Sequence, residues 1–343
     1  MQEPAMLDHV NENTIVFVVG SPLQLLNAIE ARDRFHLQDK THIFVIWAKS
    51  VEYQQMCQML DAEWSETYIY QHTKAFKLFY SWMLSSVLTT LGSVHRLYLG
   101  YPFKIRAHFA NQLKAEKTIF LDDGNASLIL AQELSGQVLY QKHQPQWYDH
   151  VLLRKIDLQY AKNAYFFTAY TEMQWPLEKV IPNDYRCIKQ RVDSVNCGVN
   201  TEVMFIGSAI AGAVVNTEQE KHLIRAMANY YQESQVLYVL HRFEDFAYFQ
   251  SEFKELNITF VQFDSAVELA LFQNKIYPKK ISSFCSSALN TLAMLYDCHF
   301  EVLAIPQPWM ETSVAKRLEI IYEDFAQRGI FIQDITKEIN NVA

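Results

Sequence analysis

Short apolar runs rich in β-branched residues alternate along this chain with longer segments of helical periodicity. This alternation is typical of βα units, in which parallel strands are buried between layers of helices. The sequence therefore predicts an α/β protein, with helices such as Pro22–Arg34 and Ala126–Glu133 between the strands. In the first half of the chain, the predicted strands are Thr14–Val19, His42–Trp47, Thr67–Tyr70, Arg96–Leu99, Lys117–Leu121 and Tyr165–Thr168.

The same pattern restarts in the second half, where the predicted strands are Val203–Ile206, Gln235–Leu240, Ile258–Val261, Lys280–Ser283 and Glu301–Ala304. Two successive βα arrays predict two similar domains that face each other across a cleft. The turn-rich segment Val180–Asn200 marks the boundary, which gives an N-terminal domain over residues 1–185 and a C-terminal domain over residues 200–343. A final helix from about Glu311 to Gln327 suits either domain and can pack back on the first.

Length and composition agree with this architecture. A chain of 343 residues is too long for one ordinary core and suits two domains. A net charge of −8 argues against a general nucleic-acid binder. The cysteines are five in number and widely spaced, without a C-x-x-C pair, which predicts reduced thiols in a cytoplasmic protein; they are Cys57, Cys187, Cys197, Cys285 and Cys298.

The beginning of the chain is polar and acidic, so it lacks the basic and apolar regions of a secretory signal. The longest apolar stretch, Ala75–Gly92, contains a lysine and several hydroxyl residues, which favour a buried or amphipathic helix over a bilayer span. The alternative is peripheral contact with the inner membrane through Phe76, Phe79, Tyr80 and Trp82.

Ligands of doubly wound sheets bind beyond the carboxyl ends of the strands, and two such places stand out in the first half. Gly20-Ser21-Pro22 follows a predicted strand and opens a helix, so its free amides can meet an anion or a substrate. Asp122 and Asp123, before a glycine, follow another strand and offer a candidate general base. Each segment also suits a plain helix start or turn without a ligand.

Two more places stand out in the second half. His241 and Arg242 follow a predicted strand, where an imidazole can donate a hydrogen bond or a proton to a departing phosphate. Ser286 and Ser287 stand at a helix start, where hydroxyls, free amides and the helix dipole form a phosphate cradle. A capping histidine and an ordinary N-cap serine are the alternatives.

The order of these motifs resembles that of bacterial GT-B sialyltransferases, the lipooligosaccharide sialyltransferase and polysialyltransferase group similar to glycosyltransferase family 52. That group has an acidic-acidic-Gly motif in its first domain, and a His-Pro motif and a Ser-Ser pair in its second. Asp122 and Asp123 match the first motif, Ser286 and Ser287 match the last, and the Ser-Pro-Leu-Gln run at Ser21 resembles the lipooligosaccharide enzymes. The resemblance implies the GT-B fold, with two Rossmann-like domains facing across a cleft.

The resemblance also implies roles for these residues. Asp123, with Asp122 as the adjacent candidate, looks like the base that deprotonates an acceptor hydroxyl. His241 looks like the group that stabilises or protonates the CMP phosphate, which Ser286 and Ser287 would hold. The other residues that we assign to the donor are Glu268, placed like a glutamate on the cytidine ribose, and Gly207, Ser208, Gly20, Ser21 and Arg242.

The implied function is inverting transfer of a nonulosonic acid, such as sialic acid, from a CMP-sugar to a glycan hydroxyl of lipooligosaccharide or capsule. No metal or other cofactor is expected, because amides, hydroxyls and an imidazole can hold a leaving monophosphate and the chain has no D-x-D pattern. The expected partners are therefore the CMP-sugar and a glycan acceptor, and not a nucleic acid.

One departure from the family pattern leaves alternatives open. His241 is followed by Arg242 where the family has proline, so the loop is expected to bend differently and the guanidinium to contact a phosphate or the donor carboxylate. Pseudaminic, legionaminic or deoxy-octulosonic acid is then an alternative sugar. A transferase or epimerase that uses a UDP- or GDP-sugar, and a glycan-binding protein without catalysis, are the alternative functions.

Overall fold

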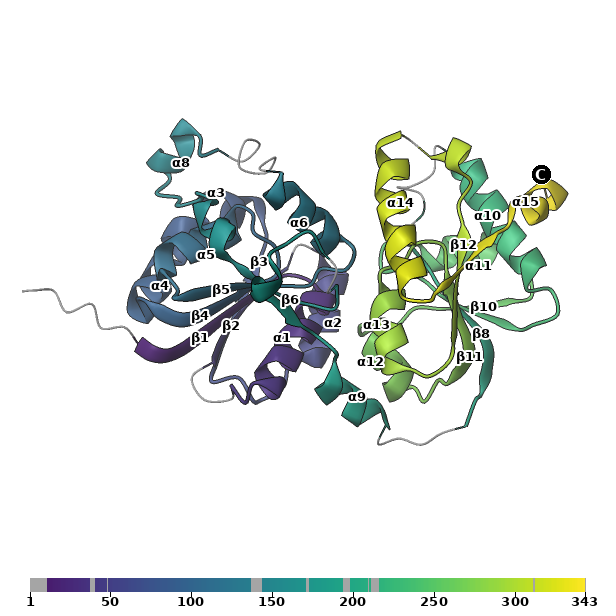
Figure 1. The fold of residues 1–343 in the computed structure, drawn as a ribbon, viewed down its shortest axis with the longest axis horizontal. Helices are drawn as coiled ribbons and strands as arrows, with labels where there is room; N and C mark the ends of the chain where they lie inside the picture. The colour runs from purple at the N-terminus through teal and green to yellow at the C-terminus, as the bar shows by residue number, and fades with distance from the viewer. Residues whose placement is uncertain are drawn as a thin grey trace, which may run out of the picture. The chain divides into compact units, whose positions relative to one another are not determined.

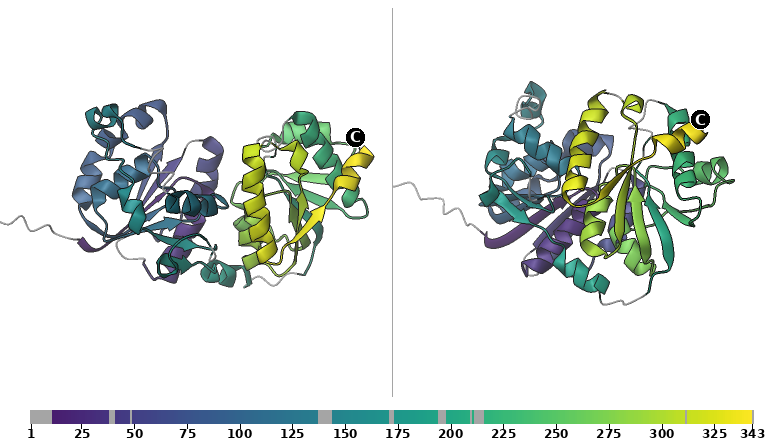
Figure 2. Two further views of the ribbon diagram at one scale, coloured as in Figure 1. Left: turned by 45° about the horizontal axis from the view of Figure 1, so that its top comes forward. Right: turned by 45° about the vertical axis from the view of Figure 1, so that its right-hand side comes forward.

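The computed structural model describes residues 11–37, 41–47, 49–136, 144–170, 173–193, 198–208, 210, 216–310 and 312–342. The polar segment before Asn11, and also Cys197 and Glu311, lie outside the described residues. The chain divides into two compact units, Met1–Cys187 and Ile188–Ala343, which we call the N-terminal and C-terminal domains (Figure 1). Each is built on a parallel sheet with helices on both faces (Figure 2), which confirms the α/β fold with two Rossmann-like domains.

The N-terminal sheet has the strand order β3-β2-β1-β4-β5-β6-β7, and every neighbouring pair is parallel. Its strands are β1 (Asn11–Val19), β2 (Thr41–Trp47), β3 (Glu66–Gln71), β4 (Val94–Leu99), β5 (Lys117–Leu121), β6 (Tyr165–Thr168) and β7 (Val180–Pro182). Its α-helices are α1 (Pro22–Arg34), α2 (Ser50–Met59), α3 (Lys74–Met83), α4 (Ser85–Leu91), α5 (Ile105–Leu113), α6 (Ala126–Ser135) and α8 (Trp147–Val151). Each of the six strands predicted for this half overlaps one of β1 to β6.

Both faces of this sheet are apolar, because helices cover both. In β1, Val16 and Val18 pack into a buried cluster that includes Phe109 of α5. Phe17 points to the opposite face, where it stacks on Tyr98 of β4 with ring centroids 4.4 Å apart. Burial on both faces explains why these strands are continuous apolar runs in the sequence.

The C-terminal sheet has the order β10-β9-β8-β11-β12-β13 and is also parallel throughout. Its strands are β8 (Thr201–Ile206), β9 (Val236–Val239), β10 (Ile258–Val261), β11 (Pro278–Ser283), β12 (His299–Ala304) and β13 (Phe331–Asp334). Its helices are α9 (Arg186–Asp193), which begins just before the domain boundary, α10 (Thr217–Tyr230), α11 (Phe246–Glu252), α12 (Val267–Gln273), α13 (Ala288–Leu295), α14 (Thr312–Gln327) and α15 (Thr336–Val342). The first strand of each sheet is thus flanked by the second and the fourth, as in doubly wound nucleotide-binding sheets.

Much of the segment predicted as a linker, Val180–Asn200, is regular structure. Val180 pairs in parallel with Phe166 as the first residue of β7, and α9 follows. The proline that ends β7 is tolerated because β7 is at the edge of the sheet, where one side of the strand needs no donor. The turn residues in this segment therefore connect a strand to a helix.

The helix predicted from about Glu311 to Gln327 is α14, but it is not the last element of the fold. The chain continues into β13 and α15. α14 packs within the C-terminal domain, where the Tyr322 hydroxyl accepts a hydrogen bond from the Ile305 amide (3.2 Å) and donates one to the Phe284 carbonyl (3.1 Å).

The apolar stretch Ala75–Gly92 forms two short helices, α3 and α4. Within the described part of the chain, no helix is both long enough and apolar enough to cross a membrane. Two of the four aromatic residues predicted as membrane contacts, Phe76 and Tyr80, belong to the buried core, so that part of the prediction is wrong. Phe79 and Trp82 are exposed.

Candidate functional site

The strand order of each sheet reverses at its first strand, and ligands of doubly wound sheets bind at this point beyond the carboxyl ends. β1 lies between β2 and β4, and β8 lies between β9 and β11. Gly20 and Ser21 follow β1, whereas Gly207 and Ser208 follow β8. Residues predicted from the sequence therefore stand at the switch point of each domain.

In the N-terminal domain, Ser21 connects the end of β1 to the end of β5. Its hydroxyl caps α1 by accepting a hydrogen bond from the Gln24 amide (3.3 Å), and it donates one to Oδ1 of Asp123 (3.0 Å). The Asp123 amide donates to the Ser127 hydroxyl (3.0 Å), and Gly124 has a φ of 65° that lets the chain turn there. These contacts hold the partly buried Asp123 carboxylate at the carboxyl edge of the sheet.

The adjacent Asp122 is placed differently. Its side chain is buried, and Oδ2 accepts a hydrogen bond from the Ala169 amide (2.7 Å) at the end of β6. Its carbonyl accepts a hydrogen bond from Asn27 of α1 (3.3 Å). Asp122 therefore fastens β5 to its neighbours, and Asp123 is the carboxylate of the pair that is more accessible to a substrate.

Arg106, which sequence reasoning missed, completes this group. A Cβ on Gly20 would lie 2.1 Å from Nη2 of Arg106, so the absence of a side chain at Gly20 lets the guanidinium lie against the backbone after β1. Burial lowers the pKa of Arg106, and the negative charge of Asp123 is the largest influence that opposes this shift. Within the described residues, Nε of Arg106 has no hydrogen-bond partner. Its only signal in the sequence is a basic residue at a helix start after β4.

In the C-terminal domain, Glu244 holds the His241 loop, and sequence reasoning missed this residue too. Its carboxylate accepts hydrogen bonds from the His241 amide (2.6 Å) and from the Tyr238 hydroxyl (3.3 Å). A Cβ on Gly207 would lie 2.3 Å from Oε2 of Glu244, so the carboxylate fits only against a glycine. Nδ1 of His241 accepts a hydrogen bond from the Phe243 amide (3.4 Å), which orients the imidazole.

A network of hydroxyls joins the ends of β8 and β11. The buried Ser283 donates its one proton to the Ile206 carbonyl (2.8 Å), so the Ser208 hydroxyl, 2.9 Å away, must donate to Ser283. The Ser286 amide also donates to Ser283 (3.0 Å), and the Cys285 amide donates to Ser208 (3.4 Å). The loop before α13 is thereby anchored at the switch point.

Ser286 and Ser287 stand directly before α13. Ser287 is the N-cap residue, and its side chain makes no capping hydrogen bond. The Ser286 hydroxyl accepts a hydrogen bond from the Ala288 amide at 3.4 Å, near the upper limit for such a bond. Both side chains are partly buried, so two hydroxyls gather at the positive end of a helix.

Glu268 in α12 is 4% exposed, so it is a buried carboxyl and not a solvated residue on the helix surface. Burial raises the pKa of its carboxyl to about 7, while its own backbone amide, the charge of Arg242 and a hydrogen bond from Thr291 of α13 limit the rise. Glu268 thus lies close to both the His241 loop and α13. A carboxyl that titrates near neutral pH is typical of a functional site.

The predicted residues therefore gather in two sets, one in each domain. The N-terminal set comprises Gly20, Ser21, Asp122 and Asp123, and the C-terminal set comprises Gly207, Ser208, His241, Arg242, Glu268, Ser286 and Ser287. Gly20 and Ser21, predicted to bind the donor, belong with the candidate base in the N-terminal domain, and their role in donor binding stays a prediction.

Comparison with known proteins identifies the fold of this chain. No protein-family model and no curated protein matches the sequence. Among solved structures, a Photobacterium phosphoreum α/β-galactoside α-2,3-sialyltransferase is 11% identical with a TM-score of 0.53, over 97% of this chain and 100% of that one. A UDP-GlcNAc 2-epimerase from Methanocaldococcus jannaschii is 10% identical with a TM-score of 0.52, over 96% and 91%. TcCGT1, solved in complex with UDP, is 11% identical with a TM-score of 0.51, over 96% and 89%. The chain is similar to these proteins in its GT-B fold.

Proposed function

We propose that this protein is an inverting glycosyltransferase that moves a nonulosonic acid from a CMP-sugar to a hydroxyl of a cell-surface glycan. The observation that carries the proposal is the asymmetry of the Asp122-Asp123 pair. The buried Asp122 carboxylate accepts a hydrogen bond from the Ala169 amide. The Asp123 carboxylate accepts one from the Ser21 hydroxyl at the switch point and interacts with the charge of Arg106. A single carboxylate presented in this way suits a general base.

The C-terminal domain supplies the features of a phosphate and nucleoside site. The hydroxyls of Ser286 and Ser287, the first amides of α13 and the helix dipole can hold a monophosphate without a metal. Glu268 offers a carboxylate to ribose hydroxyls, and Arg242 can pair with an acidic group of the donor. Transfer should therefore be unaffected by a metal chelator.

In the proposed reaction, the acceptor hydroxyl attacks the anomeric carbon and gives its proton to Asp123. Ser21 donates a hydrogen bond to Oδ1, so Oδ2 is the atom that takes the proton. The bond from the anomeric carbon to the phosphate oxygen breaks, and its electron pair leaves with CMP. His241, Ser286 and Ser287 stabilise the charge that develops on the phosphate. One displacement of this kind inverts the anomeric centre.

The experiment that tests the function is a screen of CMP-activated acidic sugars for release of CMP, with and without glycan acceptors. Asp123→Asn should lower the transfer rate by roughly a hundredfold or more, because the amide cannot take a proton. CMP binding should persist, since the nucleotide is assigned to the other domain. Asp122→Asn is the matched control: its amide oxygen can still accept from Ala169, so we expect transfer within a few fold of wild type. Equal activity of Asp123→Asn and wild type would exclude the proposed base.

A UDP-sugar epimerase is the second candidate, because the epimerase named above shares the fold over most of both chains. It predicts that a UDP-sugar binds and changes configuration without an acceptor. A glycan-binding protein without catalysis predicts saturable binding and no release of nucleotide. The same screen, extended to UDP-sugars, separates the three functions.

We extend the proposal to peripheral contact with an anionic phospholipid bilayer. α3 lies beside the segment that follows α8, since Arg154 donates hydrogen bonds to the carbonyls of Lys77 (2.8 Å) and Leu78 (3.0 Å). The large apolar side chains exposed on α3 and on the segment from Trp147 to Leu153, which includes α8, are Leu78, Phe79, Trp82, Met83, Trp147, Tyr148, Val151 and Leu153. Basic residues of α3 accompany them, a combination typical of interfacial helices. Replacing Trp82 and Trp147 by serine should abolish sedimentation with phosphatidylglycerol vesicles, and unchanged sedimentation would exclude this face.

A further inference from the structure

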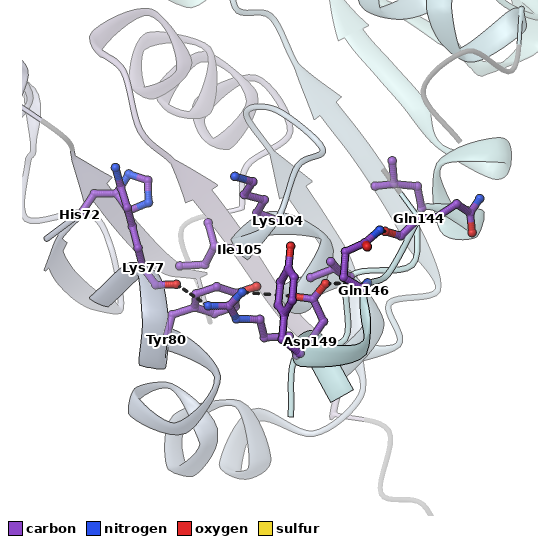
Figure 3. A pocket seen from close by; sticks show the side chains of 12 residues that line it. His72, Lys77, Tyr80, Lys104, Ile105, Gln144, Gln146 and Asp149 are labelled. Carbon is purple, nitrogen blue, oxygen red and sulfur yellow. Dashed lines mark hydrogen bonds and ion pairs between the residues drawn. The ribbon is translucent and has the colours of Figure 1, made fainter. Parts of the chain in front are cut away.

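A pocket of about 450 Å³ lies in the N-terminal domain, and neither the proposed base nor the donor residues line it (Figure 3). Lys77 comes from α3, Lys104 and Ile105 come from the start of α5, and Gln146 and Tyr148 come from the region of α8. Three separate segments of the chain thus contribute polar side chains to one cavity. α5 begins here without a side-chain cap, so its positive dipole end adds to the local charge.

The charge of this pocket is positive. Among the described residues that line it, one is acidic, Asp149, and its carboxylate accepts hydrogen bonds from Arg154 (3.1 Å) and from the Gln146 amide (2.9 Å). Lys77 and Lys104 are exposed, and neither forms an ion pair with any residue that the structure describes. Two ammonium groups therefore face the pocket without a compensating anion from the described part of the chain.

His72, which also lines the pocket, responds to this charge. Burial is the largest cause that lowers the pKa of its imidazole, and the positive charges of Lys77, Arg106 and Lys104 lower it further. His72 is therefore neutral at neutral pH and can donate or accept a hydrogen bond. Its environment also shows that the three cations converge on one region.

The pocket adjoins the candidate base through one short segment. Lys104 and Ile105 line the pocket, and the next residue, Arg106, packs against Gly20 and interacts with the charge of Asp123. A group bound in the pocket and a hydroxyl beside Asp123 can thus belong to one glycan.

We propose that this pocket binds an anionic sugar of the acceptor, one that carries a phosphate or a carboxylate. Lys77 and Lys104 would pair with the anionic group, and Gln144 and Gln146 have amides suited to sugar hydroxyls. Tyr148 adds an aromatic ring on which a sugar ring can stack. The identification of the bound sugar as part of the acceptor rests on the proposed function, whereas the binding of an anionic sugar does not.

The test measures binding of galactose 6-phosphate, galacturonic acid and galactose to the full chain by ligand-observed NMR, without any donor. We expect both anionic sugars to bind and neutral galactose to bind at least roughly tenfold more weakly, since charged hydrogen bonds contribute most. The two anionic probes show whether phosphate or carboxylate is preferred. Added salt should weaken the binding, because exposed ammonium groups are screened.

The variant K77Q/K104Q should lose at least roughly tenfold in affinity for the anionic sugars, and K114Q is the matched control. Lys114 is an exposed lysine at the other end of α5 and has a φ of 43°, close to the 44° of Lys104. Unchanged binding in K77Q/K104Q, or equal binding of charged and neutral sugars, would overturn the proposal. The proposal would also be overturned if K77Q/K104Q lost binding to anionic vesicles but kept its affinity for the sugars. The two lysines would then serve to bind lipid.

Measurements of CMP binding and CMP release by wild type, made beside the sugar-binding measurements, separate this proposal from the proposed function. If wild type binds the anionic sugars but neither binds nor releases CMP, the pocket stands as an anion site and the transferase proposal fails. If CMP is released but the anionic sugars do not bind, the pocket proposal fails and the transferase proposal stands.

Discussion

Glu268 gives a quantitative test of the C-terminal site. Burial raises the pKa of its carboxyl from 4.5 to about 7. Between these pH values the folded domain holds a proton that the unfolded chain has released, so the domain loses stability as the pH rises through this window. Above pH 7 the full penalty applies. Each pKa unit corresponds to about 1.4 kcal/mol, which makes the penalty roughly 3 kcal/mol.

Glu268→Gln removes this titration and keeps the size of the side chain and one acceptor oxygen. Near pH 4.5 the variant and wild type should have similar free energies of unfolding, because the buried carboxyl is then neutral. Above about pH 7 the variant should be more stable by up to roughly 3 kcal/mol. The affinity for CMP should depend on the same titration. Wild type should bind CMP more tightly as the pH rises through about 7, because the Glu268 carboxylate then forms. The variant should not show this gain.

Urea unfolding, followed by hydrogen exchange in peptides that cover α12 and α13, reports the C-terminal domain separately from the N-terminal one. Glu233→Gln is the control, since Glu233 is an exposed carboxylate of the same domain. It should not gain the stability above about pH 7 that is expected of Glu268→Gln. If Glu268→Gln shows the same pH dependence as wild type, the carboxyl does not titrate in the fold as described, and its assignment to the nucleoside site loses its physical basis.

Two further predictions concern the same domain. Gly207→Ala should displace the Glu244 carboxylate, because the new Cβ would lie 2.3 Å from its Oε2. The free energy of unfolding should fall by about 1–3 kcal/mol, and the transfer rate should also fall. Gly198→Ala, which meets no atom within 4 Å, should do neither, and equal denaturation midpoints for the two variants would contradict the contact. Ser286→Ala combined with Ser287→Ala should weaken CMP binding by at least roughly tenfold through lost hydrogen bonds to a charged phosphate. Calorimetry measures this loss, and an unchanged affinity for CMP would exclude the proposed phosphate cradle at Ser286 and Ser287.

The fold was predictable because both sheets are parallel and covered on both faces. Buried parallel strands such as β1 and β8 are continuous apolar runs, and that pattern is local. The strands that were missed, β7 and β13, are edge strands of three and four residues with mostly partly exposed or exposed side chains. Their pairing partners, and not their own sequences, make them strands.

The candidate site was predictable in outline but not in detail. Strand ends and helix starts are local features, so the sequence identified Asp123, Ser286 and Ser287 as candidates. The difference between Asp122 and Asp123 depends on the Ala169 amide, which is 47 residues away in the sequence. Arg106 was missed for the same reason, since only the fold places it against Gly20.

The His241 loop is restrained although it lacks the proline that the sequence resemblance led us to expect after His241. A proline at the position of Arg242 would restrict the backbone through its ring. Here the restriction comes from Glu244. Its carboxylate accepts hydrogen bonds from the His241 amide and the Tyr238 hydroxyl, and it lies close against the backbone of Gly207. Because the His241 amide is bonded to Glu244, we assign the proposed role on a phosphate to the imidazole of this residue. The loop is therefore restrained without a proline at position 242, and the guanidinium of Arg242 places a positive charge whose field acts on Glu268.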